Sequence, residues 1–492
     1  MKIQIRPHVL LLSIALTFTL MSPSRSRADT LEDLARRLDR LEQENRELRQ
    51  ALIAAIGQAK TDGLPAPTVS EPAPKPDIAT GPKEGVVRFD SSYAFAALDP
   101  TVAGKTKPLM QLGLGDGSPA VYLSGALTAV ADFQTSNRAD DFGYLMRQPG
   151  ANHIGKTASE VALHTAQLAV TTRLSPWVSA YGELLYDPQQ SFASGTITAL
   201  SRNQIQLRRG YVLIGNPKAT PFYFMAGKLD SPFGQTDTLS PFSLSTDVHT
   251  FAGLSYGALV GFSRGGLNLS LEAAQGGAEF RGLNTPVSGT NVPSQLNNFI
   301  VDANYSLPLG QPNGRLLVGA SYEAGSPYCQ TFPIQHFGPC DKANPAFAVY
   351  TTLGWNAVTL KGEFMQTVGV WPGTHNPNPP LNAFAASKVT SYDLAGRYRL
   401  PVGGKTVDLS LTFSSFLSGP TNAPWRGQDQ FVGGLAIYLE PNVKLFSELV
   451  LVNGYDPLNF LSGGIPGQNP GVSDSDPSNR SKVIMSGVNV AF

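Results

Sequence analysis

The chain has 492 residues, of which 37 are basic and 37 acidic, so its formal net charge is zero. This balance provides neither a broad basic surface for nucleic acid nor a polybasic tail for lipid headgroups. After residue 28 the chain has no run of about 18 apolar residues, so a membrane-spanning helix is not expected. A β-barrel strand shows lipid only every second side chain, and its mean hydropathy therefore looks soluble.

The first 28 residues have the pattern of a secretory signal peptide: a basic start, a mostly apolar stretch at 9–21, and a polar segment that ends Ser-Arg-Ala at 26–28. We predict cleavage after Ala28, because small residues occupy the two positions that a signal peptidase reads. A short N-terminal anchor helix is the alternative. Removal of residues 1–28 takes away four basic residues and no acidic one, leaving 33 basic and 37 acidic residues.

Leucines then recur at alternating intervals of three and four between positions 31 and 52, which is the heptad pattern of a coiled coil. Asn45 occupies a core position, where it would cost stability but fix the register between chains. In a parallel pair, Arg37 would face Glu42 of a neighbouring copy. We predict a coiled-coil helix at 29–56 that joins copies of the chain, with dimer and trimer both open. A solitary amphipathic helix is the alternative.

Residues 57–85 contain six prolines and predict an extended, semi-stiff spacer, because such a stretch cannot bury a core. From 86 to 492 the pattern changes from heptads to a period of two. At 407–414, for example, Val, Leu, Leu and Phe alternate with Asp, Ser, Thr and Ser. One apolar and one polar face is typical of a barrel strand with lipid outside and water inside.

The connections between these strands alternate strictly between short and long. Outer-membrane barrels have short periplasmic turns and long outer loops, so seven short and eight long connections predict about 16 strands. The predicted fold is therefore all-β: a transmembrane antiparallel β-barrel at 86–492, preceded by the coiled-coil helix in the periplasm. The short turns are at 175–176, 215–220, 263–266, 308–313, 356, 401–405 and 440–442, and the long segments are near 134–157, 187–201, 230–254, 276–296, 324–345, 368–389, 417–427 and 453–481.

The last strand, at 482–492, alternates apolar and polar residues and ends in Phe492. It resembles the C-terminal signature strand of outer-membrane proteins, which the barrel assembly machinery recognises. That machinery, the outer-membrane lipid and further copies of the chain are the expected partners.

A second resemblance rests on 209–216 and 221–234, where a short turn, an aromatic strand and a Gly-Lys-x-x-x-Pro-Phe-Gly exit are combined. With the heptads and the last strand, this stretch resembles outer-membrane porins that carry an N-terminal coiled coil, namely the phosphate-selective O/P porins and the LbtU-type siderophore porins. The resemblance implies a trimeric channel but no particular solute. Phosphate-selective members depend on a run of lumen arginines and lysines, which we do not find in this sequence.

Charged residues on the polar strand faces are expected to line the lumen. Seven are basic and seven acidic, and opposed charges of both signs orient polar solutes while permitting passage. The pore is therefore predicted to be weakly charge-selective, unless many of these residues are merely solvated or paired across strands. The expected pore-lining residues are Arg208, Lys228, Glu272, Asp302, Arg315, Glu323, Lys361, Glu363, Asp393, Arg397, Arg399, Asp408, Lys444 and Glu448.

The third long segment, 230–254, is the candidate constriction, because the third loop of general porins folds into the barrel. Its apolar residues could instead cover the barrel mouth or a subunit interface. The expected constriction residues are Asp230, Phe233, Asp237, Asp247 and His249.

Two cysteines, Cys329 and Cys340, lie close together in an exported chain and predict a disulfide that staples one loop. No set of four Cys and His ligands accompanies them, so neither a metal site nor a cofactor is expected. The histidines lie outside nucleophile-elbow and zinc-protease motifs. We interpret Asp247 with His249 as a polar loop contact, and we do not expect an enzyme.

Together these patterns predict a porin of the bacterial outer membrane, with a water-filled channel for passive diffusion of small polar solutes. One alternative is a substrate-specific porin for a siderophore, phosphate or another small solute. Another is an envelope tether that the barrel anchors. An energy-coupled receptor would need a globular N-terminal plug, which a heptad helix and a proline-rich spacer do not provide.

Overall fold

The computed structural model describes residues 86–89, 107–113, 118–144, 155–186, 205–235, 237–275, 296–311, 313–329, 331, 342–458, 461–463 and 470–492. The chain divides into two units, Met1–Gly81 and Pro82–Phe492, and all of these residues belong to the second. The predicted signal peptide, coiled coil and proline-rich spacer lie outside the described residues. No helix in the described part of the chain is long and apolar enough to cross a membrane.

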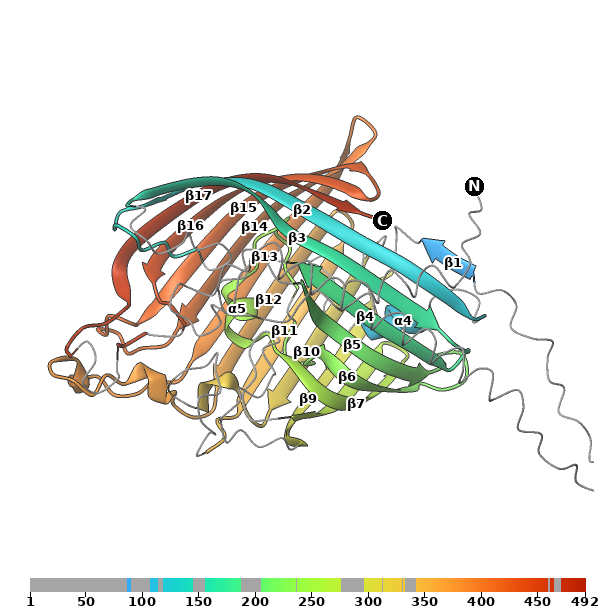
Figure 1. The fold of residues 1–492 in the computed structure, drawn as a ribbon, viewed down its shortest axis with the longest axis horizontal. Coiled ribbons are helices and arrows are strands. Elements are labelled where there is room, and N and C mark those ends of the chain that lie inside the picture. Colours follow the sequence, from blue (N-terminus) through green and yellow to red (C-terminus); the bar gives the residue numbers. More distant parts are fainter. Residues whose placement is uncertain are drawn as a thin grey trace, which may run out of the picture. The chain divides into compact units, whose positions relative to one another are not determined.

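Sixteen strands, β2 to β17, form a closed barrel (Figure 1). Each pairs antiparallel with the next, and β17 pairs back onto β2, from Ala491 opposite Ala126 to Ser481 opposite Ser136. This closure confirms the predicted all-β antiparallel barrel and its number of strands. The strands are β2 Ala120–Ser136, β3 Thr157–Arg173, β4 Val178–Tyr186, β5 Ile205–Gly215, β6 Phe222–Asp230, β7 Leu254–Arg264, β8 Leu267–Gln275, β9 Leu296–Pro308, β10 Arg315–Glu323, β11 Ala346–Trp355, β12 Val358–Thr367, β13 Thr390–Val402, β14 Lys405–Leu417, β15 Gly427–Glu440, β16 Val443–Tyr455 and β17 Asp476–Ala491.

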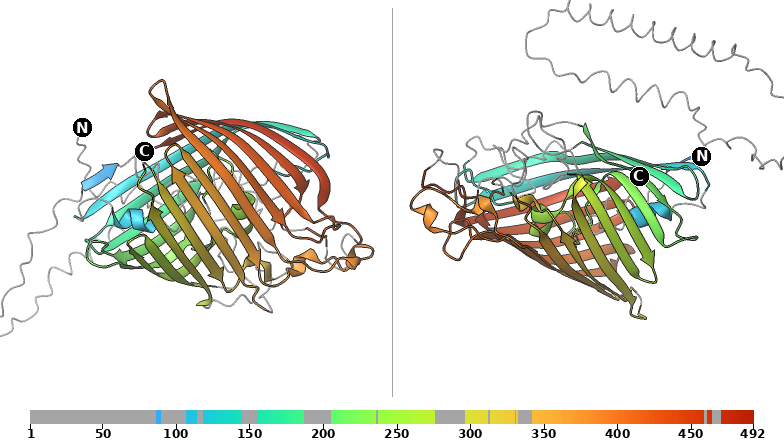
Figure 2. Two further views of the ribbon diagram at one scale, coloured as in Figure 1. Left: turned by 180° about the vertical axis from the view of Figure 1, so that it is seen from behind. Right: turned by 90° about the horizontal axis from the view of Figure 1, so that it is seen from below.

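Short and long connections alternate around this barrel, as the sequence predicts (Figures 1 and 2). The seven short ones join strands at one end, which we name the turn rim, and the eight long ones join them at the other end, the loop rim. The turn between β13 and β14 shows why the short turns can be predicted from the sequence. Gly403 and Gly404 have φ of 57° and 78°, the left-handed conformation that a two-residue hairpin of type I′ requires.

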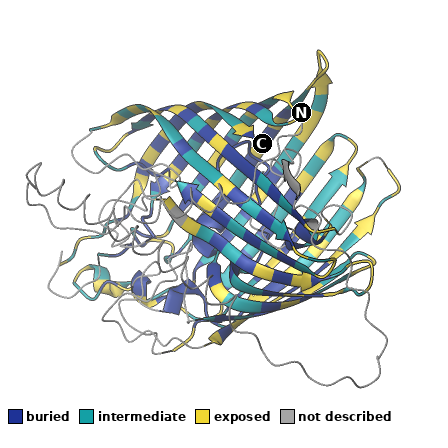
Figure 3. Cartoon of the chain, turned by 45° about the vertical axis from the view of Figure 1, so that its right-hand side comes forward, coloured by how far each residue is buried: buried dark blue, intermediate teal, exposed yellow. Residues whose placement is uncertain are grey.

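The strands alternate between exposed apolar and buried polar side chains, which gives the checkered pattern in Figure 3. In β14, Leu409 and Leu411 are 47% and 59% exposed, whereas Asp408 and Ser410 are 3% and 5% exposed. The apolar face lies outside, and the polar face is covered by what the barrel contains. This inversion of an ordinary soluble fold is the arrangement that suits a wall between lipid and water.

Loops fold into the barrel and pack an aromatic cluster near the loop rim. The connection between β6 and β7, residues 231–253, is named here the third loop. It carries the helix α5, Thr246–Phe251, whose six residues are all buried and which packs against β13 and β14. Buried aromatic and aliphatic residues from several loops join Phe233 and Phe251 in one cluster. Three short 3₁₀ helices accompany these loops, at Pro327–Cys329, Pro372–Thr374 and Leu381–Ala383.

The segment before β2 contributes two elements that the sequence does not predict. The helix α4, Lys107–Leu112, packs against β5: Tyr211 Oη donates to Gln111 Oε1 at 2.7 Å. Arg173 Nη1 donates to the Leu112 carbonyl at 2.8 Å. Since Arg173 and Tyr211 belong to the buried faces of β3 and β5, α4 lies on the inner side of the wall. The strand β1, Val86–Phe89, pairs parallel with residues 120–123 of β2.

Candidate functional site: the barrel lumen and its third loop

The third loop crosses the lumen from β6 to β16 and is held there by Glu448, which is 3% exposed. The N–H groups of Phe242 and Ser243 donate to the Glu448 carboxylate at 2.6 and 3.0 Å. The Ser243 hydroxyl donates to it at 2.5 Å. Buried backbone N–H groups need partners, so this inward carboxylate fixes the loop across the barrel.

Other inward side chains hold the loop along its length. The Thr246 N–H donates to Ser414 Oγ at 3.0 Å, and Lys444 Nζ donates to the Pro241 carbonyl at 3.0 Å. Pro241 packs against Gly434 of β15, at a position where an added Cβ would overlap the proline ring. The loop is therefore in close contact with the inner face of the wall and narrows the lumen on that side.

Lys361 of β12 organises the middle of this contact. Its Nζ lies 2.9 Å from Asp393 Oδ2 and 3.2 Å from Glu363 Oε2. It lies 3.8 Å from Asp237 Oδ1 of the third loop and donates to the Asp237 carbonyl at 2.7 Å. Glu363 also accepts the Gln235 N–H at 2.5 Å. One buried ammonium thus joins two strands to the loop, and a buried charge is tolerated when its partners surround it.

The opposite wall carries a second buried charge cluster. Arg209 Nη1 donates to Glu183 Oε1 at 2.9 Å, and Arg209 Nε and Nη2 donate to the Asp230 carboxylate at 2.6 and 2.7 Å. Tyr181 Oη also donates to Glu183, at 2.8 Å. The bidentate pairing with Asp230 orients the guanidinium as well as neutralising it.

The sequence predicts Arg208 as a pore-lining residue, but the buried arginine of β5 is Arg209. A register shift between β4 and β5 skips Arg208. Its Nε lies 3.9 Å from Glu183, and 32% of its side chain is exposed. A period of two cannot indicate such a bulge, and Glu183 is therefore not predicted from the sequence as a partner either.

Lys228, which the sequence predicts to line the pore, lies on the outward register of β6, although only 7% of it is exposed. In the register of β6 it lies opposite Gly210 and Tyr256, and Tyr256 is exposed on the outer face. Lys228 Nζ donates to the Leu207 carbonyl at 3.1 Å, beside the bulge, and lies 5.8 Å from the centre of the Tyr256 ring. A long side chain can lie along an apolar surface while its ammonium finds an acceptor, so charge alone does not indicate the face of a strand.

The other predicted pore-lining residues lie on the inward register of their strands. Arg399 is the most exposed of the paired ones, and its guanidinium makes two bonds of 2.7 Å to Asp408. Many of the rest bind the third loop or each other rather than facing open water. These inward residues are Glu272, Asp302, Arg315, Glu323, Lys361, Glu363, Asp393, Arg397, Arg399, Asp408, Lys444 and Glu448.

Four of the five predicted constriction residues are buried in the third loop, and the fifth belongs to the wall. Phe233, Asp237, Asp247 and His249 are buried in the third loop, and Asp230 is the last residue of β6. Asp247 Oδ1 accepts the hydroxyl of Ser391 at 2.5 Å, which ties α5 to β13.

Cys329, in a loop at the loop rim, is disulfide-bonded. Cys340, the other cysteine of the chain, lies outside the described residues.

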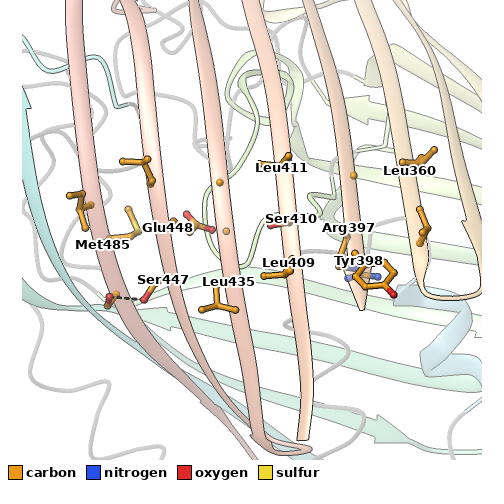
Figure 4. Close-up of a pocket in the computed structure, with 17 residues that line it drawn as sticks. Leu360, Arg397, Tyr398, Leu409, Ser410, Leu411, Leu435, Ser447, Glu448 and Met485 are labelled. Carbon is orange, nitrogen blue, oxygen red and sulfur yellow. Dashed lines mark hydrogen bonds between the residues drawn. The ribbon is translucent and has the colours of Figure 1, made fainter. Parts of the chain in front are cut away.

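A hollow of about 870 Å³ lies over β12 to β17, but it is not part of the lumen. Leu360, Leu409, Leu411 and Leu435, which line it, point to the outer face of the wall (Figure 4). The hollow is therefore a shallow depression of the apolar outer surface.

No family model matches the chain. A curated UPF0422 protein of Coxiella burnetii is 28% identical over 90 residues. That match covers 18% of this chain and 18% of the Coxiella protein, so the chain spans less than a fifth of the relative's length.

Solved structures of several outer-membrane channels are similar at low identity. The anion-selective porin from Comamonas acidovorans is 12% identical, with 76% of this chain and 100% of that chain covered and a TM-score of 0.46. The outer membrane channel DcaP of Acinetobacter baumannii is 16% identical, with 76% and 97% covered and a TM-score of 0.44. OprB of Pseudomonas putida is 10% identical, with 79% and 96% covered and a TM-score of 0.45.

Proposed function

We propose that the chain is an outer-membrane porin through which small polar solutes diffuse passively. The observation that carries this proposal is the third loop, which narrows a closed barrel of 16 strands while inward polar side chains hold it. A barrel that merely anchors a tether needs no polar interior and no loop fixed across it. The apolar outer face, with residues such as Leu411 exposed, suits lipid.

In this proposal the turn rim faces the periplasm and the loop rim faces the outside, because outer-membrane barrels have short periplasmic turns. Conductance of the purified, folded protein in planar bilayers tests the proposal. We expect discrete current steps in potassium chloride. A folded, inserted protein that gives no steps would contradict the porin and favour a tether.

We further propose that copies associate through the coiled coil predicted at 29–56, placed in the periplasm. Deletion of residues 31–56 should then lower the oligomeric mass measured by light scattering in detergent. An unchanged mass would show that the barrels associate without this segment. The leucine heptads support the proposal, since exposed core positions would be unfavourable in a single helix.

A further inference from the structure

Inward-facing charges are unevenly distributed along the barrel axis. A strand residue is assigned to the turn half when it is nearer in sequence to the short turn of its strand than to the long loop, and otherwise to the loop half. By this measure the described strands carry six inward basic residues and two acidic ones in the turn half. They are Arg173, Arg315, Lys361, Arg397, Arg399 and Lys444, against Asp408 and Glu448.

The loop half has the opposite composition. Its described strands carry eight acidic side chains on the lumen side and two basic ones, Arg208 and Arg209, while Asp302 lies at the midpoint of β9. The third loop adds Asp237, whose carbonyl accepts from Lys361, and Asp247, which accepts from Ser391 near the loop end of β13. The eight acidic residues are Asp132, Glu160, Glu183, Asp230, Glu272, Glu323, Glu363 and Asp393.

Part of the positive charge of the turn half has no carboxylate partner close by, although Lys361 is enclosed by Asp237, Glu363 and Asp393. Arg173 donates to two backbone carbonyls, and Arg315 donates to Ser306 Oγ. Within the described residues, no carboxylate lies within ion-pair distance of Arg173, Arg315 or Arg397. Arg399 has one, in Asp408. The inward charges of the described strands therefore form two regions of opposite sign placed in series, with six basic against two acidic residues in the turn half and two basic against eight acidic residues in the loop half.

We infer that the lumen is a bipolar channel, acidic towards the loop rim and basic towards the turn rim, which rectifies current and admits net-neutral zwitterions in preference to ions. Each half concentrates counter-ions of its own kind, cations in the acidic half and anions in the basic half. A potential that is positive on the loop side drives cations through the acidic half and anions through the basic half, so ions accumulate at the boundary between the halves and the current is large. The reverse potential draws both kinds of ion away from this boundary and lowers the current. This inference rests on the proposed porin function.

The same arrangement sets the class of solute. A cation is attracted by the acidic half but repelled by the basic half, and an anion meets the reverse order. A small zwitterion carries no net charge for either half to repel, and its dipole can align with the field between them. Ions of either sign therefore cross one unfavourable region that a zwitterion does not.

The current–voltage curve of singly inserted, oriented channels tests the inference. In 0.1 M KCl we expect at least about twofold more current at 100 mV with the loop side positive than with the loop side negative. The asymmetry should vanish in 1 M KCl, where the Debye length falls from about 10 Å to about 3 Å. A linear current–voltage curve in 0.1 M KCl would overturn the inference but not the proposed porin function. The absence of any conductance would contradict the porin function itself.

Substitutions of inward arginines test whether their charges cause the asymmetry of the current. The double variant Arg315→Gln with Arg397→Gln removes two charges that have no ion-paired carboxylate, so it should reduce the current ratio towards one. Lys405→Gln is the matched control, because Lys405 is 46% exposed at the turn rim and pairs with Glu440 outside the lumen. Equal ratios in the double variant and the wild type would overturn the assignment. In liposome swelling, glycine should enter faster than acetate or methylammonium of similar size, and equal rates would overturn the proposed solute class.

Discussion

Two walls of the barrel hold their buried charges in different ways. On the wall from β10 to β16, inward side chains bind the backbone of the third loop: Glu448 accepts two of its N–H groups, and Lys444 donates to one of its carbonyls. On the wall from β4 to β6, Arg209 binds Glu183 and Asp230, and these three side chains satisfy one another. The first wall uses charge to position a loop, and the second uses it to fix the wall itself.

Because the two walls use their charges differently, we expect a substitution in one wall to destabilise that wall without affecting the other. Loss of a partner inside the arginine cluster leaves carboxylates buried and unpaired, which is costly in a low dielectric. Loss of a loop anchor leaves backbone N–H groups without acceptors, which costs less, because the loop can shift towards water.

The largest effect is expected from Arg209→Met. It leaves Glu183 and Asp230 without their shared cation, and breaking a buried ion pair costs about 3–5 kcal/mol. Urea unfolding in detergent should report this loss, and hydrogen exchange should place it in β4 to β6 while the amides of the third loop keep their protection. Arg208→Met is the matched control, because Arg208 lies 3.9 Å from Glu183 and is partly exposed. Equal losses in both variants would contradict the assignment of Arg209.

A smaller effect is expected from Glu448→Gln. The amide group replaces one acceptor by a donor that faces the N–H groups of Phe242 and Ser243, and hydrogen bonds to a charged group contribute about 1.5–3 kcal/mol. The third loop should detach from β16, so its amides should exchange faster and single-channel conductance should rise. Ser447→Ala, on the outer face of the same strand, should leave both unchanged. If Glu448→Gln leaves conductance and loop exchange at wild-type values, Glu448 is not the anchor.

The barrel can be predicted from the sequence because the patterns that indicate its strands and turns involve only neighbouring residues. Alternation within a strand needs only neighbouring residues, and turns such as Gly403-Gly404 carry their conformation in their own chemistry. The strand count and the alternation of connections follow from such signals, whereas the inward third loop is expected only by analogy with general porins.

The charges of the lumen are only partly predictable, because their roles depend on residues distant in sequence. Twelve of the 14 predicted pore-lining residues lie on the inward register of their strands, whereas Arg208 is the extra residue of the bulge in β5 and Lys228 lies on the outward register of β6. Counting charges also hides their order along the axis. The order becomes visible only when each residue is placed between its turn and its loop.

The smallest expected effect concerns the contact of the first and last long loops at the loop rim. Burial, and then repulsion from Asp476 and Asp140, raises the pKa of Asp141 above its usual value. Burial, and then repulsion from Asp141, raises the pKa of Asp474 in the same way. Because folding favours the protonated form of both groups, the stability they contribute is fully present below about pH 4 and is lost as the pH rises through their raised pKa values.

The two carboxyl groups are only half-buried, and screening by solvent limits the effect to about 1 kcal/mol or less. Hydrogen exchange of residues 140–144 and 470–475, corrected for intrinsic rates, should therefore be slower at pH 4 than at pH 7. Asp474→Asn removes one charge of the repelling pair and should flatten this dependence, while the interior of the barrel is unaffected. A pH dependence that persists unchanged in the variant would assign it to other groups. Such a result would also mean that the loop rim, unlike the two walls, is not governed by the charges that meet there.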